Sequence, residues 1–273
     1  MPEYRFETHN PVNLVVEISK GNVHVRCAAD TTESTVVVEG KHADDVLVEQ
    51  RGDSISVLEP GRGRIFGDNA LHVEVVVPES SNPAIKTGSA DIQLEGRAGH
   101  AQLRSGSGDC TVDTVEGHLL VETGSGEIGV GDVRGNLKVK SGSGDVEIGE
   151  AAGTSSISTG SGDVTVETTR GNTVVKTGSG DLSIDATDGD TSFSTGSGDV
   201  SIELVRRGRV NVKGASGDVS IGVSAGVPVW TDVTTVSGTI RSDLQGAGQP
   251  EEGQDHIEVR AKTVSGDIAL SEV

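Results

Sequence analysis

Apolar and polar residues alternate along most of the chain, and glycine-rich turns interrupt the alternation at regular intervals. A tag of Thr or Ser, Gly, Ser and Gly, or a close variant, precedes an acidic residue every 18 residues. Alternation places successive side chains on opposite faces of a strand, so each 18-residue unit predicts two or three short β-strands and little helix. The acidic residues of the regular tags are Asp91, Asp109, Glu127, Asp145, Asp163, Asp181 and Asp199.

Each unit repeats the same apolar positions. If the acidic residue is position 1, positions 2, 4 and 13 are apolar and position 9 is most often glycine, as in Val146, Ile148, Ile157 and Gly153. A constant unit predicts that each one is a coil of a solenoid, with equivalent positions stacked about 4.8 Å apart. We therefore expect an all-β fold, a single-stranded parallel β-helix with 18-residue coils, and leave its handedness open. A β-sandwich or meander is the alternative, since its strands also recur every 8–12 residues.

The repeat divides the chain into three parts. Residues 1–87 contain strand-like runs without the tag, which predicts a capping region or irregular early coils, and residues 88–218 form the regular coils. Residues 219–273 carry late tags at Thr239 and Asp267 and predict irregular coils with an exposed polar loop near 245–256. The Arg-Gly-Asp sequence at 51–53 is interpreted as a hairpin turn.

Stacked coils would bring the acidic residues into a column. Carboxylates about 4.8 Å apart repel one another, so a cation or a hydrogen bond must offset the cost. Calcium, which prefers oxygen ligands, is one possibility, although Gly-Ser-Gly-Asp departs from known calcium-binding repeats and the other half of each unit lacks a matching acid. The favoured alternative is that each carboxylate bonds the backbone of its own turn. The candidate calcium ligands are Asp145, Asp163, Asp181 and Asp199.

Other polar columns admit a similar choice. The Ser and Thr residues of the tags could order water on a flat face, but we expect hydroxyls packed in a tight corner and bonded to neighbouring coils. His100 and His118 share position 10 and should stack. They could hold a metal, yet asparagine and threonine follow at the same position, which favours a polar corner.

Composition restricts the function. The formal net charge is −20 and aromatic residues make up 2% of the chain, which disfavours binding to nucleic acid or anionic lipid. No apolar run is long enough to cross a bilayer and the first residues lack the features of a signal peptide, so we expect a cytoplasmic protein without a membrane span. Cys27 and Cys110 lie among apolar residues, which predicts two buried free thiols rather than a disulfide or a redox pair.

An enzyme remains the alternative class. A carbohydrate-active β-helix would need two carboxylates about 5–10 Å apart and an aromatic platform in an irregular coil. Trp230, Asp232 and Asp243 are the candidates. No catalytic motif stands in a suitable context, so we expect neither catalytic residues nor a cofactor, apart from the calcium alternative.

The segment Val75–Pro78, followed by Lys86–Leu94 and the iterated TGSGDVxI, resembles a bacterial β-strand-repeat family of unknown function whose members are often labelled as candidate adhesins and are common in actinobacteria. The resemblance implies a β-helical domain with no catalytic residues to transfer. The coil length is also similar to that of the bactofilins, cytoplasmic polymer-forming solenoids that lack this tag. The sequence thus predicts a non-enzymatic scaffold or binding module whose flat faces engage a protein or another polymer, or associate with themselves.

Overall fold

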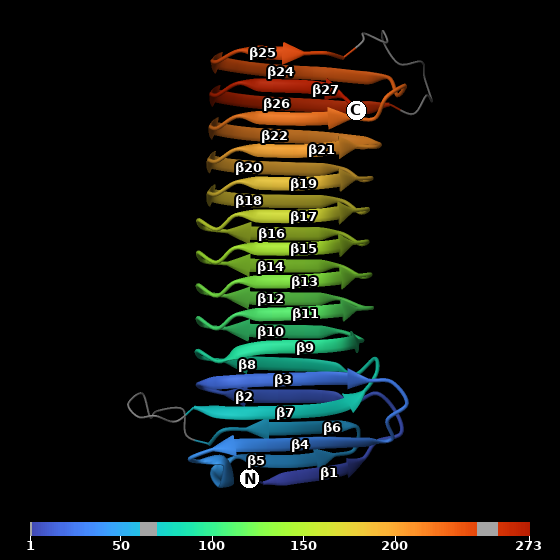
Figure 1. Cartoon of the computed structure of the whole chain (residues 1–273), viewed down its shortest axis with the longest axis vertical. Coiled ribbons are helices and arrows are strands. Elements are labelled where there is room, and N and C mark those ends of the chain that lie inside the picture. Colours follow the sequence, from blue (N-terminus) through green and yellow to red (C-terminus); the bar gives the residue numbers. More distant parts are fainter. Residues whose placement is uncertain (1, 61–69, 245–255) are drawn as a thin grey trace. The chain divides into compact units, whose positions relative to one another are not determined.

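The computed structural model describes residues 2–60, 70–244 and 256–273. The chain divides into two compact units, residues 1–135 and 136–273, and the division falls inside the stretch that the sequence marks as one run of regular coils. The strands form two sheets: sheet A contains Cys110–Val115 in the first unit and Val146–Ala151 in the second, and sheet B contains Ala101–Ser105 and Leu137–Ser141. In the regular part of each unit, one strand of sheet A and one strand of sheet B make up a coil (Figure 1). The predicted all-β solenoid is confirmed, and the described part contains a single 3-10 turn and no helix long and apolar enough to span a membrane.

The described residues of the first unit form thirteen strands, and its regular coils are in register. Leu103 pairs with Val121 in sheet B, and Cys110 pairs with Ile128 in sheet A, so residues 18 apart are neighbours as predicted. The elements are β1 (Glu3–Glu7), β2 (Asn13–Ile18), β3 (Gly21–Ala28), β4 (Glu33–Gly40), η1 (Ala43–Asp45), β5 (Leu47–Arg51), β6 (Ser54–Leu58), β7 (Leu71–Pro78), β8 (Asn82–Thr87), β9 (Asp91–Ala98), β10 (Ala101–Ser105), β11 (Cys110–Val115), β12 (Leu119–Thr123) and β13 (Ile128–Val133).

The early residues combine coils with an antiparallel end. Strands β2 and β3 pair in parallel with β8 and β9, so residues 13–28 form a coil beside residues 82–98. Strands β1, β4 and β5 pair antiparallel with their neighbours. Strand β8 lies before the boundary expected at residue 87 but belongs to the same coil as β9, because the turn of the tag joins two strands of one coil. The Arg-Gly-Asp sequence forms the hairpin turn between β5 and β6, as predicted.

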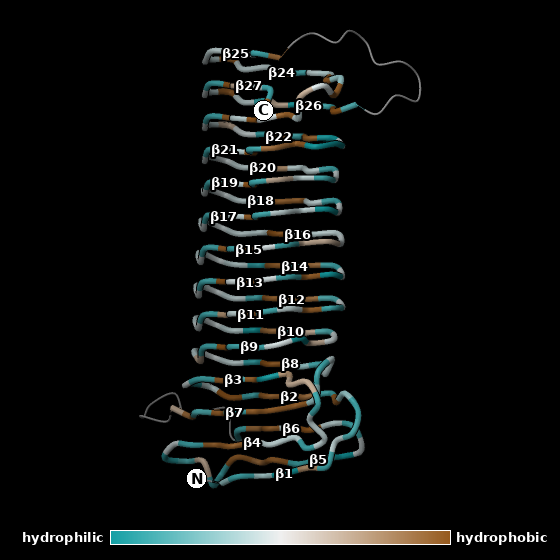
Figure 2. The backbone as a smooth tube through the Cα atoms, turned by 45° about the vertical axis from the view of Figure 1, so that its right-hand side comes forward, coloured by the Kyte–Doolittle hydropathy of each residue, from teal (hydrophilic) through white to brown (hydrophobic). Residues whose placement is uncertain are grey.

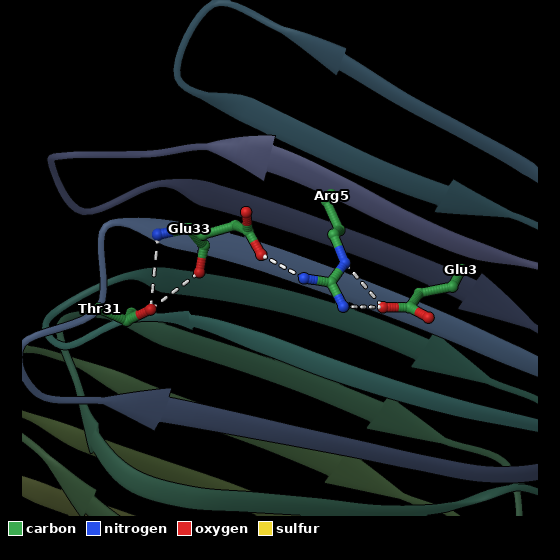
Figure 3. A network of polar contacts seen from close by, with 4 residues as sticks. All are labelled: Glu3, Arg5, Thr31 and Glu33. Carbon is green, nitrogen blue, oxygen red and sulfur yellow. Dashed lines mark hydrogen bonds and ion pairs between the residues drawn. The ribbon is translucent and has the colours of Figure 1, made fainter.

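Ion pairs join the two outermost antiparallel strands of sheet A. The Arg5 side chain on β1 contacts the carboxylates of Glu3 at 2.7 Å and of Glu33 on β4 at 3.2 Å (Figure 3). Thr31 donates a hydrogen bond from its hydroxyl to the Glu33 carbonyl at 2.9 Å. The hydrogen bond to Glu3 and the two nearby carboxylates raise the pKa of Arg5.

Outside residues 245–255, the second unit forms fourteen strands, and every described pairing between them is parallel. Val146 pairs with Val164, and Val164 with Leu182, so these core residues contact one another in sequence. The elements are β14 (Leu137–Ser141), β15 (Val146–Ala151), β16 (Ser155–Thr159), β17 (Val164–Thr169), β18 (Thr173–Ser179), β19 (Leu182–Thr187), β20 (Thr191–Ser197), β21 (Val200–Val205), β22 (Gly208–Ser216), β23 (Val219–Val223), β24 (Val229–Ser237), β25 (Ile240–Ser242), β26 (Ile257–Ser265) and β27 (Ile268–Glu272).

The last two coils of the second unit are stacked out of chain order. Strands β26 and β27 lie directly on β22 and β23, whereas the earlier strands β24 and β25 form the outer coil. The polar loop expected near 245–256 lies outside the described residues except for His256, which is exposed.

Side-chain chemistry explains this order. Strand β26 directs Ile257, Val259 and Ala261 inward, and all three are fully buried. The equivalent positions of β24 include Thr231, and on β25 Ile240 remains 44% exposed. The more apolar coil, β26 and β27, therefore lies between two other coils, where its inward side chains are covered from both directions along the stack.

The core of each unit lies between its two sheets. The inward residues of successive coils form apolar columns, so hydrophobic positions recur at equivalent places along the strands (Figure 2). Phe193 is the largest fully buried side chain, in a column with Val175 and Val212. A single coil could not bury these side chains, and the stack does so only because the register is kept.

Candidate functional site

The Ser and Thr residues of the tag close their own turns. At four regular tags, the hydroxyl three residues before the last glycine accepts a hydrogen bond from that glycine's backbone N–H. The expectation that the hydroxyls bond neighbouring coils holds at Ser105, which donates to the Ala90 carbonyl, and at Thr235, which donates to the Gly266 carbonyl. The own-turn bonds were not expected, and they form because the N–H three residues ahead lies within reach of a short side chain. The distances are 2.8 Å from Gly108 to Ser105, 3.1 Å from Gly126 to Thr123, 2.9 Å from Gly144 to Ser141 and 3.0 Å from Gly162 to Thr159.

The acidic residues instead connect one coil to the next. In six of them, one carboxylate oxygen accepts a hydrogen bond from the backbone N–H of the acidic residue in the adjacent coil. The expectation that each carboxylate bonds its own turn is therefore wrong, since the hydroxyl already occupies that role. The donor–acceptor distances are 3.0 Å from Asp109 to Asp91, 2.9 Å from Glu127 to Asp109, 2.9 Å from Asp163 to Asp145, 2.8 Å from Asp181 to Asp163, 2.7 Å from Asp199 to Asp181 and 2.7 Å from Asp218 to Asp199.

This carboxylate column continues into the reordered coils. Asp267 donates its backbone N–H to Asp218 at 2.8 Å, and Thr239 donates to Asp267 at 2.7 Å. The hydrogen bonds follow the spatial order of the coils and not their order in the chain. A backbone N–H at the corner would otherwise depend on water alone, so each carboxylate satisfies a donor that the sheets leave unpaired.

The candidate calcium ligands Asp145, Asp163, Asp181 and Asp199 all belong to this column. Each uses one carboxylate oxygen on a backbone N–H, and each turn brings a single acid. In the part of the chain that the structure describes, no group of three or more His, Cys, Asp and Glu side chains is placed to hold a metal. Calcium takes six to eight oxygen ligands, so this donor set does not fit the ion.

The column predicts how substitutions at Asp181 affect stability. Asp181→Ala removes the acceptor for the Asp199 N–H and should lower the free energy of unfolding by about 1 kcal/mol. Asp181→Asn keeps an acceptor oxygen and removes one charge from a row of like charges, so it should be at least as stable as the unchanged chain. Urea unfolding of both variants measures the difference. If both lose the same free energy of unfolding, the negative charge of Asp181 and not its hydrogen bond stabilises the column.

Calcium should not change the thermal stability. A ligand that binds only the folded state raises the melting midpoint, so the midpoint in about 1 mM calcium should equal that in chelator. Differential scanning calorimetry with magnesium as the matched control checks this. A rise specific to calcium, abolished in Asp163→Ala, would establish a site in the column.

A second polar column lies at the opposite corner. The rings of His100 and His118 are 5.2 Å apart, and His118 donates its backbone N–H to Nδ1 of His100 at 2.9 Å. His100 in turn donates its N–H to the Asn82 side chain at 2.8 Å, and in the second unit Thr154 bonds Asn136 at 3.3 Å. The predicted stacking is confirmed, and the His100 nitrogen is engaged in the same inter-coil bond that the amides make elsewhere.

Both cysteines are buried free thiols, as predicted. Cys27 lies on β3 and Cys110 on β11, with 4% and 0% of their surface exposed. Burial, helped by Glu79 near Cys27 and by Asp109 near Cys110, raises the pKa of each thiol to about 12. The reactive thiolate is therefore disfavoured at neutral pH.

Thiol labelling should report this burial. In the native protein at pH 8, a chromogenic disulfide reagent should leave Cys27 and Cys110 unmodified for several minutes. In denaturant, the same reagent should modify both thiols rapidly. Serine variants at each position serve to assign the signal. Rapid labelling of the native protein at either residue would contradict the burial of that thiol.

The residues of the enzyme alternative do not converge. The guanidinium of Arg260 lies 5.2 Å from the centre of the Trp230 ring, and Asp232 is 3.4 Å from the Lys262 amine. Trp230 and Asp232 face outward from β24 in sheet B, whereas Asp243 follows β25 in sheet A. A carboxylate pair beside an aromatic platform is therefore not formed by these residues.

The outward faces of the sheets carry the remaining repeated chemistry. In the second unit, an open groove of about 880 Å³ crosses sheet A, and three carboxylates line it beside small residues such as Ser201 and Ser220. The carboxylates belong to Glu167, Asp185 and Glu203 on successive strands of the sheet. The sequence analysis did not identify this groove. The acidic residues at position 5 of three successive units could have indicated a row of carboxylates on one sheet face.

Two-strand coils, a carboxylate column that joins them and exposed repeated faces define a β-solenoid repeat protein. The chain belongs to the Toastrack DUF4097 family, whose model matches residues 12–271. This confirms the resemblance seen in the tags.

The solved structures to which the chain is similar are distant from it in sequence. A “putative adhesin” from Bacteroides fragilis has 12% identity and a TM-score of 0.36, and the match covers 100% of this chain and 96% of the adhesin chain. A “putative adhesin” from Parabacteroides distasonis has 11% identity and a TM-score of 0.43 with the same coverage. A “putative lipid binding protein” from the latter organism has 10% identity and a TM-score of 0.36, again with the same coverage. No curated protein matches the chain.

Proposed function

We propose that the protein is a non-enzymatic scaffold that binds an extended partner, a protein or another polymer, along its sheet faces. One observation carries the proposal. The repeated hydroxyls of the turns close their own turns and the repeated carboxylates hold coils together, so the repeated groups left for a partner are the outward side chains of the strands. Equivalent side chains about 4.8 Å apart suit a partner that makes the same contact many times.

Photo-crosslinking tests the proposal. A benzophenone amino acid replaces Val174, which faces outward from β18, or Thr165, which faces outward from β17. The control position is Asn172 in the corner before β18. A defined adduct in extracts of the source cells is expected at one or both face positions and not at the corner. Absence of adducts at both faces would overturn the binding role.

A polysaccharide panel separates the scaffold from the enzyme alternative. The protein should release no new reducing ends, and Asp232→Asn should behave as the unchanged chain does. Turnover that disappears in Asp232→Asn would favour a carbohydrate-active enzyme.

A further inference from the structure

Charges are segregated between the two sheets of the second unit. From β15 to β23, the charged side chains on the strands of sheet A are all acidic, and from β14 to β22 those of sheet B are all basic. We define the acidic face as Glu147, Glu167, Asp185 and Glu203, and the basic face as Lys138, Lys176 and Lys213, all of them exposed. A net charge of −20 does not require a basic face, so its presence points to a specific contact.

The first unit handles its charges differently. Arg104 contacts Glu122 at 2.9 Å within sheet B, and Arg97 on β9 contacts Glu79 at 3.4 Å. In the second unit, Arg170 pairs with Glu150, and Arg209 pairs with Glu258, beside the two faces. Each of these charges has its partner inside the chain. The acidic face instead places carboxylates on successive strands, where they repel one another.

The two faces match in spacing. Glu167, Asp185 and Glu203 occupy equivalent positions on successive strands, about 4.8 Å apart, and Glu147 lies on the preceding strand two residues out of their register. Lys176 and Lys213 occupy equivalent positions on every second strand, about 9.6 Å apart, and Lys138 lies two strands before Lys176, two residues out of their register. Lys176 and Lys213 can therefore each lie between two carboxylates of a facing sheet. The groove over Glu167, Asp185 and Glu203 includes several small side chains, which leave room for a lysine side chain to enter. Leu204, Val273 and Arg206 line it as well, and the Arg206 guanidinium is paired with Asp188 at 3.6 Å.

We propose that the acidic face of one molecule docks on the basic face of a second copy. This names the partner for the scaffold role and rests on it. The contact joins two different surfaces, so it propagates from copy to copy and produces open assemblies instead of a closed dimer. Five strands give a face of about 20 Å by 20 Å, below the roughly 800 Å² per partner of a stable interface, so the association is weak.

Salt determines when the contact forms. At very low salt, the negative charge of the whole chain opposes association. At 0.15 M salt the Debye length is about 8 Å, so the long-range repulsion between two chains is screened more strongly than are contacts at ion-pair distance. At 1 M salt the contacts themselves are screened. Association is therefore expected near physiological salt and is lost at high salt.

Sedimentation velocity of the full chain over a concentration series tests the proposal. The basic-face variant is Lys138→Glu with Lys176→Glu and Lys213→Glu, and the acidic-face variant is Glu167→Lys with Asp185→Lys and Glu203→Lys. Each alone should associate at least about tenfold more weakly than the unchanged chain. An equimolar mixture should associate again, although both variants remain net negative. The matched control, Lys20→Glu with Lys41→Glu and Arg51→Glu, changes the net charge as the basic-face variant does and should associate normally.

Several outcomes overturn the proposal. A strict monomer at all concentrations does so, as does association that survives 1 M salt or fails to return in the mixture. Binding of a polyanion such as polyphosphate to the basic face of a monomeric chain would replace the second copy as the occupant. Adducts to a different protein at the face positions, from a chain that stays monomeric, would retain the scaffold role while removing self-docking.

Discussion

Gly162→Ala should lower the free energy of unfolding by about 3 kcal/mol or more, one of the largest losses expected for a single methyl group in this chain. A Cβ atom at this residue would lie 2.1 Å from the Gly144 carbonyl oxygen and 2.6 Å from its carbon. Both atoms are backbone of the neighbouring coil, so the methyl group fits only if two coils separate. Urea unfolding followed by circular dichroism measures the loss.

Gly214→Ala is the matched control in the same unit. Its Cβ would meet Thr195 and Thr263 side chains at 3.6 and 3.8 Å, which are ordinary contacts. The backbone of Gly214 lies in β22, where alanine costs no more than glycine. We expect a change within about 0.5 kcal/mol, or a small gain. Equal effects of the two substitutions would contradict the close stacking at Gly162.

Phe193→Ala should cost about 3–5 kcal/mol, because it removes the largest fully buried side chain and leaves a cavity between the sheets. The neighbours in the column, Val175 and Val212, belong to rigid parallel strands and can close the space only in part. Calorimetry should show a melting midpoint lowered by roughly 6–20 °C.

Two variants make this test specific. Phe193→Val places the residue type of the adjacent coils in the column and should lose clearly less than Phe193→Ala. Ser194→Ala, the next residue on the outward side of β20, should change stability by less than about 0.5 kcal/mol. A loss at Ser194 equal to that at Phe193 would show that backbone strain in β20, and not the cavity, causes the effect.

The register of the regular strands could be predicted from the sequence, because a fixed unit of 18 residues places equivalent positions of successive coils next to one another. Val146, Val164 and Leu182 are adjacent for that reason. The hydrogen bonds of the turn were assigned the wrong way round: Thr159 bonds its own turn and Asp163 the neighbouring coil. A short hydroxyl and a carboxylate are both acceptors, so the residue types alone do not tell which backbone N–H each one takes.

The order of the final coils could not be predicted from the repeat. The tags at Thr239 and Asp267 are similar, and either coil could extend the stack from β23. The choice depends on the inward residues, apolar on β26 and partly polar on β24, compared across segments that the repeat treats as equivalent. The sheet faces were likewise visible in the sequence as outward positions, but the separation of lysines from carboxylates appears only when strands are assigned to two sheets.

Because β26 and β27 lie inside β24 and β25, the sequence in which a ribosome produces the coils differs from the sequence in which they are stacked. Residues 229–242 leave the ribosome before the coil on which they finally rest. During translation they either wait without a neighbour or occupy β22 and β23 until the C-terminal residues displace them. The fold of this unit therefore reaches completion only after residues 257–272 have left the ribosome.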